Sequence, residues 1–428
     1  MQEIAVAAGL ALLSLMAALP ASAAPTEEEI LAGADARIQQ HRTALARIVV
    51  VDRLGRPVPG ARVRVEQQRH AFLFGANAFP LLGHADPARE ALYQKRFTDL
   101  LNYATLGFYW GAYEREPGKT DADRLERQAR WLKSRGIPAK GHPLVWHEVY
   151  PGWAPSDPDD ARNLLRQRVV DIVGRFKGLI DRWDVVNEVT VSDRFDNGVG
   201  RWAKRDGGAK LVAEALEWAR GANRQAILLY NDFNVSPAYE KLAEELTRRR
   251  GLVDALGIQS HMHGGEWTIP RAWEVCETYA RFGVPLHFTE LTVLSGPHGW
   301  NLKPPWPTTP AGEARQADYV VKLYTTLFSH PAVEAITWWD LHDGAWQGAP
   351  AGLIRADYSP KPAYERLLAL IRDRWWTRVE TETGPDGVAA VRGFLGDHEV
   401  SVEQGGAMVR RPLRITRTGA NRVTLTLP

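Results

Sequence analysis

The sequence contains little cysteine, little net charge and only one long hydrophobic run. Cys276 is the only cysteine among 428 residues, which excludes an internal disulfide and any multi-cysteine zinc site. The 53 Lys and Arg residues balance 51 Asp and Glu residues, so the net charge of +2 gives no electrostatic footprint for nucleic acid or an anionic membrane surface. Hydrophobic residues at 45% and charged residues at 24% exclude a disordered chain, a collagen-like chain and a protein with many membrane spans.

Tryptophan is the residue type that is unusually frequent, at 16 of 428 residues. Its large flat face loses little rotamer entropy on burial, and sugar rings stack on such faces. Large protein cores also use tryptophan, so composition alone leaves both interpretations open.

The long hydrophobic run, Ile4 to Leu19, lies at the N-terminus and is followed by the small residues Ala21-Ser22-Ala23. Its 16 residues are short for a membrane span. We interpret residues 1–23 as a secretory signal peptide, which predicts a secreted or periplasmic protein with no membrane attachment after cleavage. Because Met1-Gln2-Glu3 carries no basic side chain, an uncleaved anchor helix is the alternative.

Residues 24–66 are predicted to form an N-terminal helix and a β-hairpin. Thr26 and Glu29 have the spacing of a capping box, and helical periodicity continues to about Ala46. Two β-branched runs within residues 47–66 then flank a Gly/Pro-rich turn, which favours a hairpin. A lone hairpin is barely stable, so we expect it to pack on another element.

Residues 67–376 alternate short apolar strands with amphipathic helices. Repeated strand–helix units over about 300 residues predict an α/β fold, a closed (β/α)8 TIM barrel. An open doubly wound sheet is the alternative, but such sheets usually carry a Gly-rich phosphate loop after an early strand. The nearest candidate, Asp206 to Lys210, lacks that strand. The strand candidates are Phe72–Gly75, Tyr103–Phe108, Ala139–Val145, Asp181–Val186, Ala226–Asn231, Ala255–Ser260, Pro285–Thr289 and Ala335–Trp339.

Residues 377–428 change to a period of two with Gly and Pro turns, which predicts a C-terminal β domain. We expect strands at Val388–Phe394, His398–Val402, Leu413–Arg417 and Arg422–Leu427. Packing of this segment with the predicted hairpin would make one small accessory β domain from both ends of the chain. It either caps the barrel or binds carbohydrate.

Polar and aromatic residues follow several of the predicted barrel strands, where barrel enzymes place their reactive groups. Glu188 ends the fourth strand and Glu290 ends the seventh. Two carboxyl groups on either side of a glycosidic bond can cleave it, one as proton donor and one as nucleophile or base. Asn187 beside Glu188, together with His and Trp on adjacent strands, favours this chemistry over two solvated strand-end charges.

Several blocks, in order along residues 68–372, resemble glycoside hydrolase family 10, the endo-1,4-β-xylanase family. The blocks are Gly141–His147, Trp183–Glu188, Tyr230–Asn234, Gly257–His261, Thr289–Leu291 and the Trp-rich block at 338–346. The resemblance implies a retaining β-glycoside hydrolase acting on β-1,4-linked xylan-type polysaccharide or oligosaccharide. It implies Glu188 as general acid/base and Glu290 as nucleophile, and no cofactor, because proton transfer and carboxylate attack suffice.

The resemblance also implies a substrate-binding set around the sugar in subsite −1, the site of the sugar that is attacked. Asn187 would bind its 2-hydroxyl, His142 would bind the same sugar, and Trp146 would form its floor. Gln259 would contact nucleophile and sugar, and His261 would hold Glu290. Trp338 and Trp346 would wall the site.

The sequence departs from the family after the second strand. Where the family usually has Glu-Asn-x-Met-Lys-Trp, this chain has Thr105-Leu106-Gly107-Phe108-Tyr109-Trp110. The three residues that grip xylose at subsites −2 and −1 are thereby replaced by Thr105, Leu106 and Tyr109, and Tyr109 joins the expected substrate-binding residues. A site that leaves sugar hydroxyls unpaired discriminates against that sugar. Another β-glycoside is therefore an alternative substrate.

Two further departures concern the last two strands. The family's Glu-Leu-Asp is Glu290-Leu291-Thr292, so the Asp that would orient His261 is missing. Trp339 stands where the family usually has Gly.

Other function classes stay open. A barrel that binds carbohydrate without cleaving it is the alternative from a different class. His261 and His263 form a His-x-His pair, yet metal-dependent barrels usually carry such a pair on their first strand, so we expect no metal. The oligomeric state is not predicted.

Overall fold

The computed structural model describes residues 24–428 except 301 and 304–305. The predicted signal peptide, residues 1–23, lies outside the described residues. Within the part described, none of the helices has the length and apolarity that crossing a membrane requires.

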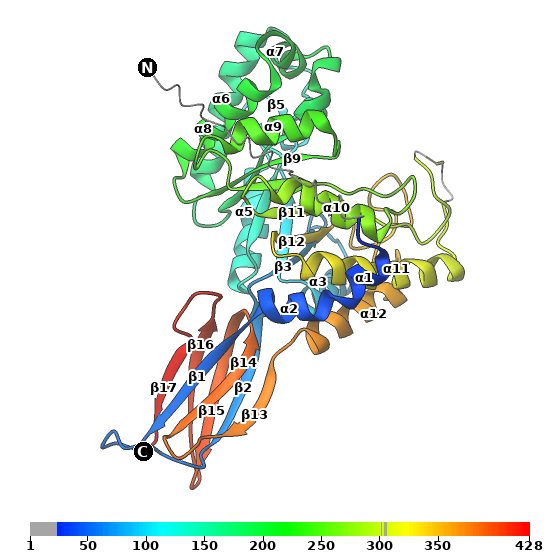
Figure 1. The fold of residues 1–428 in the computed structure, drawn as a ribbon. Coiled ribbons are helices and arrows are strands. Elements are labelled where there is room, and N and C mark those ends of the chain that lie inside the picture. The colour runs from blue at the N-terminus through cyan, green and yellow to red at the C-terminus, as the bar shows by residue number, and fades with distance from the viewer. Residues whose placement is uncertain (1–23, 301, 304–305) are drawn as a thin grey trace, which may run out of the picture.

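The centre of the molecule is a closed parallel barrel, which confirms the predicted (β/α)8 fold (Figure 1). Each predicted barrel strand is present, and the strands alternate with amphipathic helices. The barrel order is β10-β11-β12-β3-β4-β7-β8-β9. The strands are β3 (Leu73–Asn77), β4 (Tyr103–Gly107), β7 (Ala139–His142), β8 (Arg182–Asn187), β9 (Ile227–Asp232), β10 (Ala255–Ile258), β11 (Leu286–Leu291) and β12 (Val333–Trp338).

The barrel helices begin with recognisable N-terminal signals. Pro occupies the first turn of several of them, because its missing N–H costs nothing there. The principal helices are α3 (Pro87–Leu100), α5 (Ala122–Ser134), α6 (Pro158–Arg175), α7 (Gly198–Asp206), α8 (Gly208–Ala222), α9 (Pro237–Thr247), α10 (Ile269–Ala280), α11 (Pro310–Ser329) and α12 (Pro362–Ala369). Shorter elements are α4 (Trp110–Tyr113), β5 (Glu114–Glu116), β6 (Lys119–Thr120), η1 (Val189–Arg194) and η2 (Leu370–Arg374).

The N-terminal helix is shorter than predicted and is divided at Gly33. It consists of α1 (Glu27–Ala32), with the predicted Thr26–Glu29 capping box, and α2 (Ala34–Arg42). The prediction of helix to Ala46 is wrong, because β1 (Thr43–Val51) begins immediately after α2 and pairs with two other strands. Helices α1 and α2 pack on α10 and α11 of the barrel.

The remaining strands form two facing sheets built from both ends of the chain. One sheet has the order β14-β1-β17 and the other β13-β2-β15-β16. Figure 1 shows the blue strands β1 and β2 among the orange and red C-terminal strands. The strands are β1, β2 (Arg62–His70), β13 (Arg378–Glu382), β14 (Val388–Phe394), β15 (Gly396–Gln404), β16 (Ala407–Ile415) and β17 (Arg422–Thr426).

The predicted hairpin within residues 47–66 is wrong, although both of its strands exist. Strand β1 pairs with β14 and β17, whereas β2 pairs with β13 and β15 in the other sheet. The alternating residues Ile48 and Val50 of β1 face Val63 and Val65 of β2 in one apolar core. The link between them does make a short turn, in which Val51 bridges Pro57 and the Val58 amide donates to the Val50 carbonyl. The chain then crosses to the opposite sheet, so that the valines of the two strands meet across the core.

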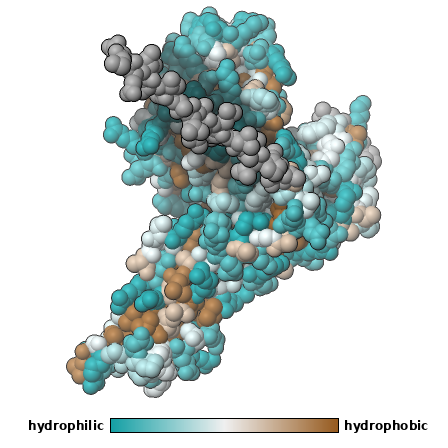
Figure 2. Space-filling view, in the orientation of Figure 1, coloured by the Kyte–Doolittle hydropathy of each residue, from teal (hydrophilic) through white to brown (hydrophobic). Residues whose placement is uncertain are grey.

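This β sandwich packs against the amino-terminal ends of the barrel strands. The Arg69 guanidinium bonds both Asp397 of β15 and the Gly136 carbonyl before β7. The carboxyl ends of the barrel strands therefore stay free for a site. Figure 2 shows hydrophobic surface on the sandwich, where Leu45, Leu54 and Met408 are exposed. The division of the chain at 66/67 and 376/377 stays a prediction.

Candidate active site

A cavity of about 670 Å³ lies at the carboxyl ends of the barrel strands. It brings together nine of the residues that the sequence analysis selected, although they are spread over 238 positions from Tyr109 to Trp346. The nine are Tyr109, His142, Trp146, Asn187, Glu188, Gln259, His261, Glu290 and Trp346. Their individual roles stay predictions.

Glu188 follows β8 in a left-handed backbone conformation, with a φ of 58°, which residues other than glycine rarely adopt. Its Oε1 accepts hydrogen bonds from Gln259 at 2.6 Å and Asn187 at 2.9 Å, and its Oε2 accepts one from Trp146 at 3.0 Å. Burial raises the pKa of Glu188 to about 8, and the nearby charge of Glu290 adds to this effect. The carboxyl group therefore retains a proton at neutral pH.

Glu290 lies on β11 and has the opposite electrostatic environment. Its Oε1 accepts a hydrogen bond from Asn231 at 2.7 Å, and its Oε2 lies 3.0 Å from His261 Nε2. Burial by itself would raise the pKa of Glu290, but His142, His261 and Lys140 outweigh it and the net pKa is lowered. The two carboxyl groups are thus set apart, one as a proton carrier and the other as an ionised carboxylate.

Asn231 connects these two carboxyl groups. Its Nδ2 donates to Glu290 and also to Asn187 Oδ1 at 2.8 Å, while Asn187 donates onward to Glu188. Thr289 Oγ1 donates to Asn231 Oδ1 at 2.5 Å and orients the amide. The sequence analysis quoted the block Tyr230–Asn234 without assigning Asn231 a place. Its position at the carboxyl end of β9, beside β8, was the available signal.

His142 is oriented from inside the barrel. Its Nδ1 lies 2.8 Å from Asp184 Oδ2, and Asp184 also pairs with the fully buried Lys140 at 2.6 Å. The Asp184 bond places the Nδ1 hydrogen of His142 inward, so Nε2 faces Glu290 Oε1 at 3.7 Å. Lys140 and His142 together bring positive charge or hydrogen-bond donors toward the Glu290 carboxylate.

Gln259 makes a different contact from the one that the resemblance implied. Its Nε2 donates to Glu188, and no described side-chain contact joins it to Glu290. The backbone carbonyl of Gln259 instead accepts a hydrogen bond from the Glu290 amide at 3.1 Å.

His261 faces Glu290 through Nε2, and its ring lies against Trp346 with ring centroids 4.2 Å apart. Among the described residues, its Nδ1 has no hydrogen-bond partner. Thr292, at the position of the missing Asp, bonds His263 Nδ1 instead, at 3.1 Å. His261 therefore donates from Nε2 to the carboxylate without a partner that fixes the other side of its ring.

The prediction that Trp338 walls the cavity is wrong, and Trp339 takes this position. Trp338 is fully buried, and its indole N–H donates to the Ala351 carbonyl at 2.8 Å. Successive residues of a strand point to opposite sides, so only one of the pair can face the cavity.

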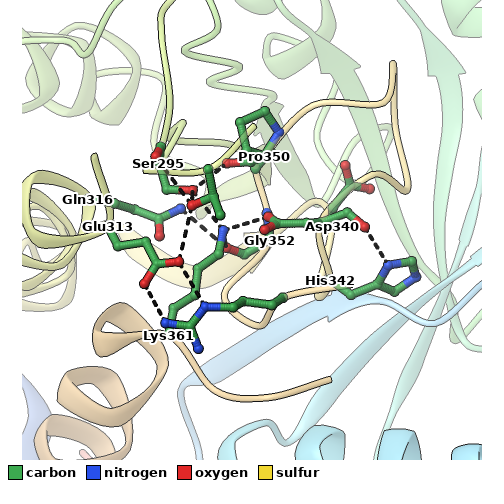
Figure 3. A network of polar contacts seen from close by, with 12 residues as sticks. Ser295, Glu313, Gln316, Asp340, His342, Pro350, Gly352 and Lys361 are labelled. Atoms are coloured by element: carbon green, nitrogen blue, oxygen red, sulfur yellow. Dashed lines mark hydrogen bonds and ion pairs between the residues drawn. The ribbon is translucent and has the colours of Figure 1, made fainter. Parts of the chain in front are cut away.

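A buried network holds the segment that follows β12. Lys361 Nζ donates to Asp343 Oδ1 at 2.5 Å, Ser295 Oγ at 2.8 Å and the Gly352 carbonyl at 2.9 Å (Figure 3). Gln316 reaches the same Gly352 carbonyl. The network ties the loop that carries Trp346 to the segment after β11, to α11 and to the start of α12, and so holds one wall of the cavity.

Several lining residues were not selected from the sequence. They are Glu148, Phe233, Asn234, Val235, Ser260, Trp267, Trp300, Trp339 and Gln347. Most lie in loops after the strands, where the spacing of residues in the sequence does not indicate which side chains point into the cavity. Aromatic residues directly after predicted strand ends, such as Phe233, were the usable signal.

Three neighbouring residues, two of which line the cavity, could share one metal ion. The ligand atoms of His147, Glu148 and Glu188 lie within 4.8 Å of one another. An ion there would occupy Glu188, the proton carrier. The expectation of no metal stays a prediction.

A family model, Glycosyl hydrolase family 10, matches residues 71–370. The chain belongs to glycosyl hydrolase family 10. The match covers the barrel and both glutamates. With its xylanase relatives, this makes the family 10 chain a xylanase-like glycoside hydrolase.

Relatives of this family 10 chain differ in how much of their length is matched. Endo-1,4-beta-xylanase B of Thermotoga neapolitana is 27% identical over 284 residues, covering 62% of this chain and 78% of that protein. Anti-sigma-I factor RsgI6 of Acetivibrio thermocellus is 27% identical over 388 residues, covering 87% of this chain and 46% of that protein. The chain thus spans less than half of RsgI6.

A solved structure supports the same fold. The native xylanase 10B from Thermotoga maritima aligns with a TM-score of 0.60 at 25% identity, covering 71% of this chain and 96% of that chain.

Proposed function

We propose that the protein is a retaining β-glycoside hydrolase that cleaves β-1,4-linked xylan-type polysaccharide or oligosaccharide by double displacement. The observation that carries the proposal is the placement of two carboxyl groups in one cavity with different partners. Glu188 accepts hydrogen bonds from the neutral side chains of Gln259 and Trp146, whereas Glu290 lies beside His142 and His261. Burial accordingly raises the pKa of Glu188, and the neighbouring positive groups lower that of Glu290. Xylan is supported by the family and by relatives whose names are endo-1,4-beta-xylanase.

In the first step, the Glu188 carboxyl group donates its proton to the glycosidic oxygen while a Glu290 carboxylate oxygen attacks the anomeric carbon. The carbon–oxygen bond to the leaving group breaks, and a glycosyl ester of Glu290 forms. The ester carries no charge, so the repulsion that helps to keep Glu188 protonated disappears.

In the second step, the Glu188 carboxylate takes a proton from water, and the water oxygen attacks the same carbon. The ester bond breaks and returns Glu290 to its charged form, with net retention at the anomeric carbon. Asn187, next to Glu188 in sequence, is proposed to bind the sugar 2-hydroxyl, and His142, Trp146, Tyr109 and Trp346 to bind the ring.

Azide rescue of the two glutamate variants tests the roles separately. With an activated aryl β-glycoside and azide, Glu188→Ala should give a β-glycosyl azide, because azide replaces water in the second step. Glu290→Ala should give an α-glycosyl azide by direct displacement. Glu28→Ala, an exposed carboxylate on α1, is the matched control. Inverted product from the wild type would disprove double displacement.

A substrate panel tests the glycone. Wild type and Glu290→Ala are compared on xylan, arabinoxylan, β-glucan and aryl β-glycosides. Release of xylo-oligosaccharides by the wild type, and its loss in Glu290→Ala, would support xylan as the substrate. Cleavage of a different glycan, with none of xylan, would identify that β-glycoside as the substrate.

A non-catalytic carbohydrate-binding protein is the second candidate. The match to RsgI6, named an anti-sigma-I factor, over 87% of this chain favours considering it. Glu188→Ala distinguishes the two, since an enzyme loses turnover whereas a binding protein keeps its affinity and never had turnover.

We also propose export to the periplasm or the medium. Comparing the N-terminus of the mature protein with residues 23–25 tests it.

A further inference from the structure

Three aromatic rings close one end of the cavity, and we call Phe79, Tyr109 and Trp339 the aromatic wall. The Phe79 ring lies edge-on to Tyr109 at 5.9 Å and to Trp339 at 5.6 Å between ring centroids. It covers Gly107 so closely that a Cβ there would lie 3.1 Å from the ring. Phe79 therefore fills the space above the end of β4.

The cavity lining shows the effect of this ring. Residues at or after the ends of β4, β7, β8, β9, β10, β11 and β12 line the cavity, but among the described residues none that follows β3 does. Phe79 follows β3 and lies behind Tyr109 and Trp339, so the cavity stops at these two rings.

The aromatic wall stands on the side of the nucleophile's partners. The Trp339 ring lies 5.3 Å from the His142 ring and 6.0 Å from the His261 ring. Both histidines face Glu290. Phe233, 45% exposed, follows β9, the strand beside the Glu188 strand. The leaving group takes its proton from Glu188 and lies on the Glu188 side, whereas the attacked sugar lies over Glu290. The wall therefore stands at the glycone end.

A second glycone sugar would find neither room nor partners beyond the wall. Thr105 and Leu106 are fully buried, and the wall offers two polar groups, the Tyr109 hydroxyl and the Trp339 indole N–H, far fewer than the hydroxyls and ring oxygen of a second sugar. Sugar hydroxyls that lose water without new hydrogen bonds oppose binding.

We infer that the enzyme removes one terminal sugar at a time from the non-reducing end of a β-linked chain, and that the aromatic wall excludes a second glycone sugar. This inference rests on the proposed function and adds the mode of attack.

The position of the first cut tests it directly. Xylohexaose labelled at its reducing end should first give labelled xylopentaose and free xylose. An aryl β-xyloside should have a kcat/KM about tenfold above that of the matching β-xylobioside. Early labelled xylotriose, or a faster xylobioside, would overturn the inference.

Substitutions in the wall provide a second measurement. Phe79→Ala should raise the xylobioside-to-xyloside ratio of kcat/KM by about tenfold, because it opens space behind Tyr109. Phe79→Leu keeps the volume and should leave the ratio within about twofold. Phe233→Ala, at the other end, should change both rates in proportion. An unchanged ratio in Phe79→Ala, with wild-type melting temperature, would contradict the wall's role.

Covalent labelling separates this inference from the proposed function. Dinitrophenyl 2-deoxy-2-fluoro glycosides of xylose, xylobiose, glucose and cellobiose are used, and peptide mass spectrometry locates the adduct. A monosaccharide adduct on Glu290 that forms faster than its disaccharide counterpart supports both ideas. A faster disaccharide adduct overturns the inference alone, and failure of all four to label Glu290 overturns both.

Discussion

Asn231 Nδ2 lies 2.7 Å from Glu290 Oε1 and 2.8 Å from Asn187 Oδ1, so one amide positions residues on both sides of the cavity. Thr289 holds the other end of that amide. The geometry of the proposed nucleophile thus depends on a side chain that need not contact the sugar.

Asn231→Ala should lower kcat by about 10²-fold, since misplacing a reacting group by about 1 Å has an effect of that size. Asn231→Asp should instead shift the acidic limb of the kcat/KM profile to higher pH. Its negative charge would raise the pKa of Glu290, which must be ionised to attack. A pH–rate profile of both variants checks this, and an unshifted acidic limb in Asn231→Asp would contradict the electrostatic contact.

The basic limb of the wild-type pH profile of kcat/KM should reflect the ionisation of Glu188. Because its pKa is raised to about 8, kcat/KM should stay high at neutral pH and fall as the pH passes through about 8. An activated dinitrophenyl leaving group needs little protonation, so the fall should weaken with this substrate. The same fall for both leaving groups would assign the limb to another residue.

Folding stability should carry the same signature. Glu188 has a folded pKa of about 8 against an ordinary value of 4.5, so the folded state retains the proton longer than the unfolded chain. The stability that the protonated Glu188 side chain contributes to the fold is fully present below pH 4.5 and is lost as the pH rises through about 8. Glu188→Gln cannot ionise, so its melting temperature should rise relative to that of the wild type as the pH increases from 4.5 to about 8. Parallel melting curves from pH 4 to 9 would contradict the shift.

Trp338 and Trp339 form a matched pair of substitutions. Trp339→Ala should lower kcat/KM because it removes a cavity wall. Trp338→Phe should lower the free energy of unfolding by about 1–2 kcal/mol, because the Ala351 carbonyl loses its donor, and should leave kcat/KM nearly unchanged. Steady-state kinetics and denaturant unfolding of both variants separate the two effects. A large loss of kcat/KM in Trp338→Phe, with little change in Trp339→Ala, would show that Trp338 lines the cavity.

Lys361→Met should destabilise the fold by about 3–5 kcal/mol, because the Asp343 carboxylate would stay buried without its partner. Adding Asp343→Asn should recover most of this loss, since the unpaired charge is then gone. Denaturant unfolding of the two variants measures the difference. Equal destabilisation of both would mean that the lysine acts through packing and not through charge.

Much of the fold follows from local patterns. Each barrel strand was predicted because buried parallel strands are continuous apolar runs between amphipathic helices, and these patterns need no distant partner. Glu188 and Glu290 were selected because each ends a strand, and parallel strands bring their carboxyl ends to one rim.

Strand pairing could not be obtained in the same way. Residues 47–66 contain two strands and a turn-like link, which predicts a hairpin, yet β1 and β2 lie in opposite sheets. Their partners are more than 300 residues away, and the sequence carries no local mark of that pairing.

The sequence by itself determined the barrel, the strand-end glutamates and the loss of polar groups at Thr105, Leu106 and Tyr109, because identity and periodicity are local properties. Only the tertiary structure decided that Trp339 and not Trp338 faces the cavity, that Asn231 joins the two carboxyl groups through Asn187, and that Phe79 lies behind Tyr109 and Trp339. These outcomes depend on which side chains meet in space, and packing between distant segments sets that.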